Sequence, residues 1–327
     1  LCFGTAFFAV LIGLAGLDAA RHWALGSKFL FVFILLLFLY CCLLPLGPMI
    51  DAAALLFLSR HSRRELYGTY RLWGTYGWSV ACILMGALLY LLRCDALIFF
   101  GTAFAFGALG LSSWSGVETR PAAAPITIPW RHLKKDTLFQ GFLIFTFCNG
   151  IVAGAAANYT SYFFDDVMKT PLEIGLIFGL WTLLEIPVMK HSRKLIETFG
   201  NSRLIMAGLL INGIRLYLYS FFTLETPFAW KFAVSLLQGP GFGLTHIGII
   251  DFVDRRAHAA MRATYLSINN VARSSVAAAL GGIGGSWLIR QWGSAFLMQF
   301  CGYGSLVLIL FFAFLVRGRP GRDQGPA

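Results

Sequence analysis

Residues 67–92 read YGTYRLWGTYGWSVACILMGALLYLL, a polar beginning followed by a long apolar run. The part from 72 to 92 carries no charged side chain, and a helix of about 20 residues is long enough to cross a hydrocarbon core of about 30 Å. This stretch therefore predicts a transmembrane helix whose first turn lies next to Arg71.

The rest of the chain repeats this pattern. We predict ten crossings in all, at residues 1–17, 29–58, 72–92, 96–114, 138–160, 172–189, 204–222, 229–251, 264–289 and 295–316. The composition agrees, with 58% hydrophobic residues, 13% charged residues and a mean hydropathy of +0.72. These values predict an all-α integral membrane protein and exclude a soluble enzyme.

Positive charge alternates between the gaps that separate these segments. Eighteen of the 26 Lys and Arg residues lie in the gaps after the even-numbered crossings, and six lie in the other gaps. By the positive-inside rule, the first residue, the linker after crossing four and the C-terminus are expected in the cytoplasm. Because insertion explains the net charge of +11, we do not expect a nucleic-acid partner.

The longest polar stretch, 115–137, contains three prolines and separates four crossings from six. We predict an N-terminal helix bundle at 1–114, a cytoplasmic linker at 115–137, a second bundle at 138–316 and a cytoplasmic tail at 317–327. The chain begins inside an apolar segment without an initiator Met. Two further helices ahead of residue 1 would give two bundles of six helices each, so we expect an N-terminally truncated fragment.

The third crossing carries a recognisable motif, Gly68-x-x-Arg71-x-x-Gly74-x-x-Gly77-Trp78. It resembles the start of helix 5 in lactose-permease-like transporters of the major facilitator superfamily. The resemblance implies a two-bundle major facilitator fold in which helices 3–12 are present. It also implies alternating-access transport of a small polar organic solute such as a sugar or nucleoside, with proton symport as one mechanism. The three glycines are expected to allow close helix packing.

The same resemblance assigns Arg71 to solute hydroxyls and Trp78 to stacking against a sugar ring. An interfacial anchor is the alternative for Arg71, and an aromatic-belt or core residue for Trp78. Asp51 follows two prolines in the second crossing and needs a cavity or a cation, with Arg71 as the nearest candidate. It is either a solute contact or part of a structural ion pair. Asn149, on the fifth crossing, is a further candidate for the solute pathway.

The second half resembles the helix 8 to helix 9 passage of the same family. Its residues are Glu185-Ile186-Pro187-Val188-Met189, then Lys194 to Gly200, then Gly213-Ile214-Arg215. Glu185 and Arg215 lie at depths that allow contact between neighbouring crossings. They are expected to form a charge pair that switches with protonation, or else a permanent salt bridge.

The segment that corresponds to helix 10 of the family departs from the family's usual pattern. Gln238 stands where many relatives have a histidine, and Gln238 cannot titrate. His246 and Asp251 are candidates to replace that function, although Asp251 also fits a charged cluster in the following loop. Arg273, within the ninth crossing, is the other intramembrane ionisable candidate. Proton coupling and facilitated diffusion therefore both stay open.

Other functional classes have weaker support. His246-x4-Asp251 has the spacing found in some lipid acyltransferases but lies in a glycine-rich apolar segment, so we expect no enzyme. A receptor or scaffold with a transporter fold is the remaining alternative. We expect no metal or cofactor, and seven cysteines without CxxC spacing are expected to be packing residues. Gly281-Gly282-Ile283-Gly284-Gly285 favours close helix packing over a nucleotide loop.

Overall fold

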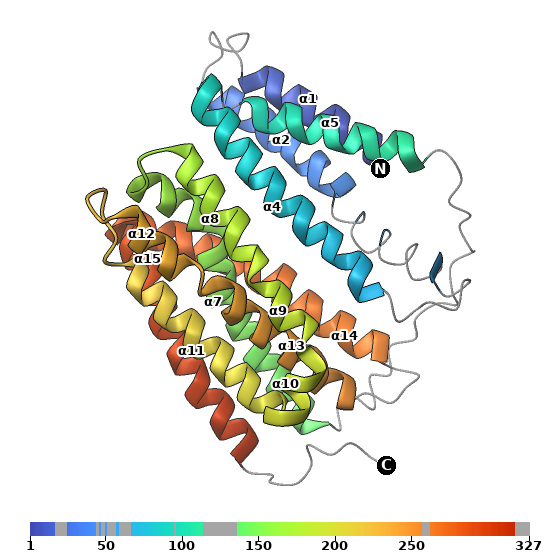
Figure 1. Ribbon diagram of the computed structural model, residues 1–327, viewed down its shortest axis with the longest axis vertical. Helices are drawn as coiled ribbons and strands as arrows, with labels where there is room; N and C mark the ends of the chain where they lie inside the picture. Colours follow the sequence, from blue (N-terminus) through green and yellow to red (C-terminus); the bar gives the residue numbers. More distant parts are fainter. Residues whose placement is uncertain are drawn as a thin grey trace. The chain divides into compact units, whose positions relative to one another are not determined.

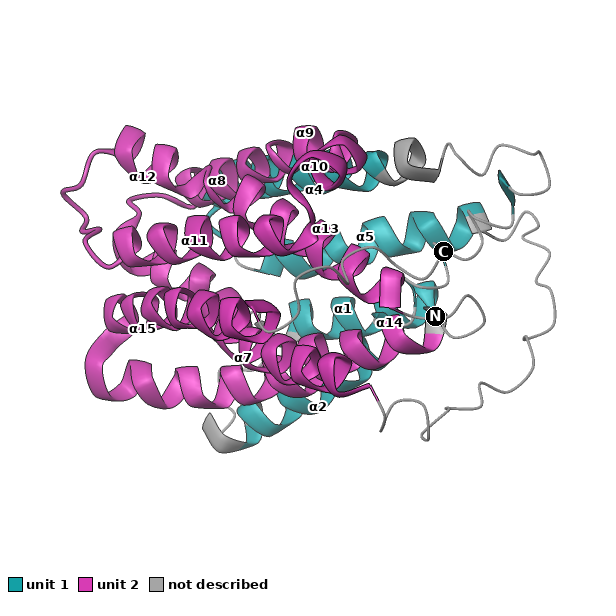
Figure 2. Cartoon of the chain, turned by 90° about the horizontal axis from the view of Figure 1, so that it is seen from below, with its two compact units in different colours: residues 1–123 teal, residues 124–327 magenta. Residues whose placement is uncertain are grey.

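The computed structural model describes residues 1–16, 25–43, 46, 50, 57–58, 67–94, 96–113, 136–256 and 262–317. These residues are helical apart from short connections, and none of them forms a strand. The chain divides into two compact units, residues 1–123 and 124–327, which are coloured separately in Figure 2. The division falls inside the stretch that the sequence analysis assigns to a linker. Each unit is described by itself below.

The described residues of unit 1 form four long helices, α1 (Cys2–Gly16), α2 (Leu25–Leu43), α4 (Tyr67–Leu92) and α5 (Ala96–Ser113), labelled in Figure 1. Its small core joins α1, α2 and α5 through Ala9, Ile12, Leu35, Leu39 and Ala103. Much of α4 remains exposed within the described residues, including Trp73, Tyr76 and Trp78. The predicted second crossing, 29–58, is described as a continuous helix only up to Leu43.

Unit 2 begins with α7 (Thr137–Val167), α8 (Pro171–Leu183), α9 (Glu185–Lys190), α10 (Ser192–Phe199) and α11 (Asn201–Tyr219). It continues with α12 (Phe228–Ser235), α13 (Gln238–Arg256), α14 (Arg262–Asn270), the π-helix η4 (Val271–Ala277) and α15 (Ala278–Arg317). The sequence explains several of these boundaries. Asp136 caps α7 by accepting a hydrogen bond from the Phe139 amide, and Thr170 caps α8 directly before a proline at the first helical position.

Two aromatic-rich clusters form the core of unit 2. Near one end, Phe163, Phe164 and Tyr219 pack with Trp181 and Leu297. Near the other end, the core is made of phenylalanines and aliphatic side chains, namely Phe139, Phe142, Phe145, Phe252, Phe312, Ile205 and Leu209. These clusters hold α7 along α15 and place α11 beside α13 and α15 (Figure 1).

Five described helical segments are long and apolar enough to cross a membrane, and three shorter apolar helices lie in unit 1. The longest segment, Thr264–Arg317, covers both the ninth and the tenth predicted crossing. It is broken at Gly293, whose backbone has φ 86° and ψ 171°, a conformation that glycine adopts without a Cβ clash. The chain is therefore a multi-pass integral membrane protein, and the predicted all-α class is confirmed.

Some predicted boundaries need correction. The fifth crossing, predicted at 138–160, extends to Val167, because Phe163, Phe164 and Val167 continue its buried face. The short helix α10 lies in the gap between the sixth and seventh predicted crossings. Its residues SRKLIETF place apolar side chains between charged ones, and Arg193 pairs with Glu197 one turn later at 2.8 Å.

Candidate functional site

Three interrupted helices surround one pocket in unit 2. The α8/α9 helix is interrupted at Leu184, the α12/α13 helix just before Gln238, and η4 replaces one stretch of α-helix between α14 and α15. Each of them contributes to the pocket wall, through Trp181, Gln238 and Arg273 respectively. Interrupted helices and π-helical turns free backbone groups and re-aim side chains, and they often accompany functional sites.

The first two interruptions lie against each other. A Cβ at Gly239 would meet the Trp181 carbonyl oxygen at 2.6 Å and the Leu184 Cβ at 2.8 Å. Only glycine allows this approach, and Pro240 follows directly. The GlyPro pair thus explains why Gln238 begins a new helix at the pocket edge.

The pocket has a volume of about 350 Å³, at the small end of the range for ligand sites. Phe178, Trp181, Leu209, Leu216 and Phe242 form much of its apolar wall. Its polar lining comes from α7, α11, α13, η4 and α15, and comprises Asn149, Thr160, Asn212, Arg215, Gln238, Thr245, Arg273, Ser274 and Ser305.

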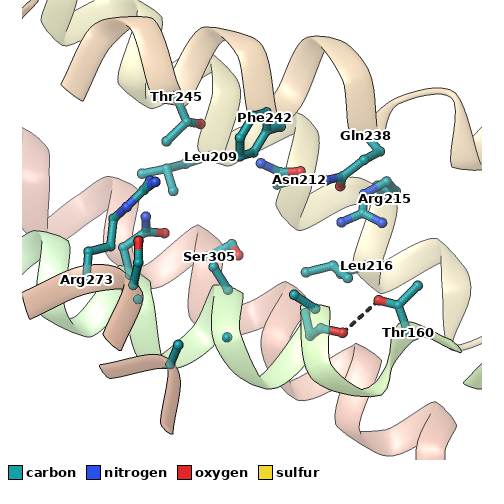
Figure 3. A pocket seen from close by; sticks show the side chains of 18 of the residues that line it. Thr160, Leu209, Asn212, Arg215, Leu216, Gln238, Phe242, Thr245, Arg273 and Ser305 are labelled. Carbon is teal, nitrogen blue, oxygen red and sulfur yellow. Dashed lines mark hydrogen bonds between the residues drawn. The ribbon is translucent and has the colours of Figure 1, made fainter. Parts of the chain in front are cut away.

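Several of these polar atoms have no partner in the part of the chain that the structure describes. They are Nε and Nη1 of Arg215, Oδ1 of Asn212 and Oε1 of Gln238. Figure 3 shows these three side chains together at one end of the pocket, whereas Arg273 lies at the other end. The Arg215 guanidinium lies 5.0 Å from the centre of the Tyr219 ring.

The hydroxyl groups around the pocket are oriented by their own helices. Thr160 donates to Ala156 O at 2.6 Å, Thr245 to Gly241 O at 2.9 Å and Ser305 to Cys301 O at 3.0 Å. Because each hydroxyl donates its hydrogen to a backbone carbonyl, its oxygen remains available only as an acceptor. The pocket thus combines guanidinium donors with several acceptor oxygens.

Of the predicted site residues, Asn149, Arg215 and Arg273 come together around this pocket. Glu185 does not line it, and within the described residues no ion pair joins Glu185 to Arg215. The expected charge pair is thus absent from this structure, because Glu185 begins α9 beyond the break at Leu184. Its formation in another state stays a prediction.

His246 and Asp251 also lie outside the pocket lining. The His246 ring stacks on Phe242, with centroids 5.3 Å apart. Asp251 accepts hydrogen bonds from Arg255 at 2.7 Å and from Asn201 at 3.2 Å. This arrangement places Asp251 in the charged cluster at the end of α13, which is one of the two alternatives that its sequence position left open.

The predicted site residues of the first half all belong to unit 1. Asp51 lies outside the described residues, while Gly68 and Arg71 belong to α4 without a described side-chain environment. Trp78 is 57% exposed. The close packing expected at Gly74 and Gly77 is not seen, since a Cβ at either position would meet nothing within 4 Å. This face of α4 simply has no neighbour there among the described residues.

Sequence reasoning missed Asn212 and the aromatic wall. Asn212 precedes Arg215 by three residues, so the two share one face of an otherwise apolar helix. That spacing was a usable signal. Phe178 and Trp181 gave no signal, because aromatic residues in an apolar segment are equally expected in a core.

Comparisons with known proteins agree with this architecture. The sequence profile described as the MFS_1 like family matches residues 2–300. The chain belongs to the MFS_1-like family. It is 27% identical over 311 residues to the maltose permease of Geobacillus stearothermophilus, covering 91% of this chain and 75% of that protein. It is 29% identical over 223 residues to the uncharacterized transporter YwbF of Bacillus subtilis (strain 168), covering 68% of this chain.

This MFS_1-like chain spans about half of YwbF, namely 53% of its length. Among solved structures, the D323A mutant of the nucleoside transporter NupG matches with a TM-score of 0.74. The match covers 95% of this chain and 83% of that one, at 15% sequence identity, and so shows a shared fold. This match confirms the predicted major facilitator fold. The family profile and the similarity to maltose permease confirm the predicted class of solute transporter.

Proposed function

We propose that this MFS_1-like protein moves a small polar organic solute by alternating access, and that the unit 2 pocket forms part of the solute site. The observation that carries the proposal is the set of unpaired polar atoms on Asn212, Arg215 and Gln238. A buried polar atom without a partner costs roughly 1–3 kcal/mol, which a solute hydroxyl group would recover on binding. The similarity to maltose permease supports a sugar, and the nucleoside transporter's fold is compatible with a nucleoside.

For the first half, solute contacts are proposed from the family resemblance alone. Arg71 would donate to solute hydroxyls, Trp78 would stack on a ring, and Asp51 would either accept from the solute or pair with Arg71. Replacing Arg71→Lys should weaken solute binding about tenfold, because a point-charge ammonium does not reproduce the planar donor fork. Wild-type affinity in this variant would make Arg71 an interfacial anchor.

Proton coupling is the finer part of the proposal. Glu185 is half-buried next to the break in α8/α9 and would take up a proton there. On releasing this proton, the Glu185 carboxylate would approach Arg215. Exchange of a labelled solute needs no net proton movement, whereas accumulation does. Replacing Glu185→Gln should therefore abolish gradient-driven accumulation while exchange persists. Unchanged accumulation would remove Glu185 from the mechanism.

A facilitator is the second candidate, and one observation favours it. Gln238 lines the pocket and does not titrate, so the pocket itself offers no proton carrier on α13 at that position. His246 and Asp251 would then have structural roles on α13, and Arg273 would act in binding alone.

The proposed orientation places the first residue, residues 115–137 and the C-terminus in the cytoplasm. It rests on the eighteen positive residues in the gaps after even-numbered crossings. A cysteine at 126 should react with an impermeant maleimide only from the cytoplasmic side, and reaction from the other side would reverse the orientation.

The deciding experiment is uptake of labelled sugars, nucleosides and small organic acids by the protein in proteoliposomes, with and without an inward proton gradient. Accumulation driven by the gradient indicates symport, and downhill flux alone indicates a facilitator. Absence of flux for every solute, in protein that remains folded, would contradict transport and favour a receptor or scaffold.

A further inference from the structure

The unit 2 pocket has an unbalanced charge. Two arginines, Arg215 and Arg273, line it, and no Asp or Glu stands among its described lining residues. Within a membrane-spanning bundle, ionisable side chains are normally paired with a counter-charge. The pocket therefore has room for a negative charge that its own lining does not supply.

Arg215 shows this deficit most clearly. Its residue is 5% exposed, and Nε and Nη1 have no hydrogen-bond partner in the described structure. The Tyr219 ring, 5.0 Å away, offers the cation a π-face but no lone pair for these N–H groups. Desolvating a cation without a counter-ion is unfavourable. A ligand that brings an anionic group to Arg215 would remove that penalty.

The neighbours of Arg215 specify the rest of the ligand. Oδ1 of Asn212 and Oε1 of Gln238 are unpaired acceptors at the same end of the pocket (Figure 3). They fit hydroxyl or N–H groups close to the anionic group. Phe178 and Trp181, whose ring centroids lie 4.6 Å apart, belong to the same wall and offer an apolar surface.

We propose that the pocket selects an organic acid, with its carboxylate on Arg215 and its hydroxyl groups on Asn212 and Gln238. A guanidinium and a carboxylate form paired, charge-assisted hydrogen bonds that a neutral group does not match. Arg273, at the far end of the pocket, adds to the positive potential that attracts the acid. This inference rests on the proposed transport function and narrows its substrate to acids of sugar-like size.

The test compares acids with their neutral amides, which keep size and hydroxyl pattern. Purified protein in detergent is melted with glucuronate or glucuronamide, and with mandelate or mandelamide, because a ligand that binds the folded state raises the Tm as its concentration exceeds its Kd. We expect at least one acid to raise the Tm at concentrations at least tenfold below its amide. Equal effects of acid and amide, or no effect of either acid, overturn the proposal.

Variants tie the preference to Arg215. Arg215→Gln should reduce the affinity for the acid at least tenfold. The affinity of Arg215→Lys should lie between that of the wild type and that of Arg215→Gln. Arg193→Gln is the control, because Arg193 is exposed and paired with Glu197. Full acid affinity in Arg215→Gln contradicts the proposal.

The melting temperature without ligand shows whether Arg215 is unpaired or is held in a structural ion pair. Removing one partner of a buried ion pair is strongly destabilising, whereas neutralising an unpaired buried cation relieves a penalty. We expect Arg215→Gln to melt at or above the wild-type temperature in ligand-free buffer. A clear decrease would mean that an internal carboxylate holds Arg215, and would overturn the proposal.

Uptake assays distinguish this inference from the broader function. Transport of neutral sugars or nucleosides, with no effect of acids, refutes the acid preference and leaves the transport proposal intact. Absence of flux and of stabilisation with every solute refutes both.

Discussion

Two glycine-bearing helix faces differ in what surrounds them. On α4 of unit 1, a Cβ at Gly74 or Gly77 would meet no atom of the described residues within 4 Å. Between α7 and α15 of unit 2, a Cβ at Gly154 would lie 2.5 Å from Ala278 Cα, and one at Gly281 would collide with Ile151 O. Small residues permit close helix packing, but only an adjacent helix makes them necessary.

One tryptophan from each unit shows the same contrast. Trp181 of unit 2 is 9% exposed and packs against Phe164 and Phe178, while Trp78 on α4 is 57% exposed. Replacing Trp181→Ala should lower the free energy of unfolding by about 3–5 kcal/mol, as for other buried aromatic residues. Replacing Trp78→Ala should cost less than about 1 kcal/mol. Thermal melting of both variants in detergent checks this difference, and equal losses would contradict it.

A matched glycine pair on α15 tests the packed face. Gly281 is buried against α7, whereas a Cβ at Gly284, one turn further, would meet none of the described residues within 4 Å. Gly281→Leu should destabilise the protein by about 1–3 kcal/mol through overpacking, and Gly284→Leu should change little. The midpoints of thermal unfolding give the comparison. A loss for Gly284→Leu as large as that for Gly281→Leu would show that the two positions are equally packed.

The link between α7 and the second half of α15 should show a smaller effect. Ser294 Oγ donates to Asp166 Oδ2 at 2.5 Å, directly after the break at Gly293. Asp166→Asn should cost about 1 kcal/mol, because the amide oxygen can still accept from Ser294 but no longer carries a charge. Asp165→Asn is the neighbouring control on an exposed side chain. If both variants melt like the wild type, this contact does not hold the helices.

The smallest effect is expected on the open face. Gly77→Leu should change the free energy of unfolding by no more than about 0.5 kcal/mol, as for other uncrowded surface positions. Destabilisation above about 1 kcal/mol in a melting experiment would mean that the α4 glycines pack against a helix after all. That outcome would restore the role that the sequence motif suggested for Gly74 and Gly77.

The comparison also explains what the sequence could predict. Long apolar segments and the placement of Lys and Arg predicted the membrane class and most helix bounds, because helix length and charge placement follow directly from the bilayer. They did not predict that α8 and α9 separate at Leu184, or that η4 winds as a π-helix around Arg273. Such local changes depend on packing between helices distant in sequence, as at Gly239 and Trp181.

For the candidate site, residue chemistry was informative and pairing was not. Arg215 and Arg273 were recognised as candidates because a cation within a membrane-spanning apolar segment is energetically costly and is usually functional. Their common pocket and the separation of Arg215 from Glu185 required a three-dimensional arrangement. Depth along a helix places two residues at one level, but the direction in which each side chain points depends on helix rotation.

Solute protection of a pocket cysteine tests whether the solute binds in the unit 2 pocket. In a background without the seven native cysteines, Ala153→Cys places a thiol on the exposed part of the pocket wall, and Glu225→Cys in the loop before α12 serves as the control. The account predicts that the transported solute slows maleimide labelling at 153 at least severalfold and leaves labelling at 225 unchanged. Equal labelling at 153 with and without solute, in protein that still transports it, would place the solute outside this pocket.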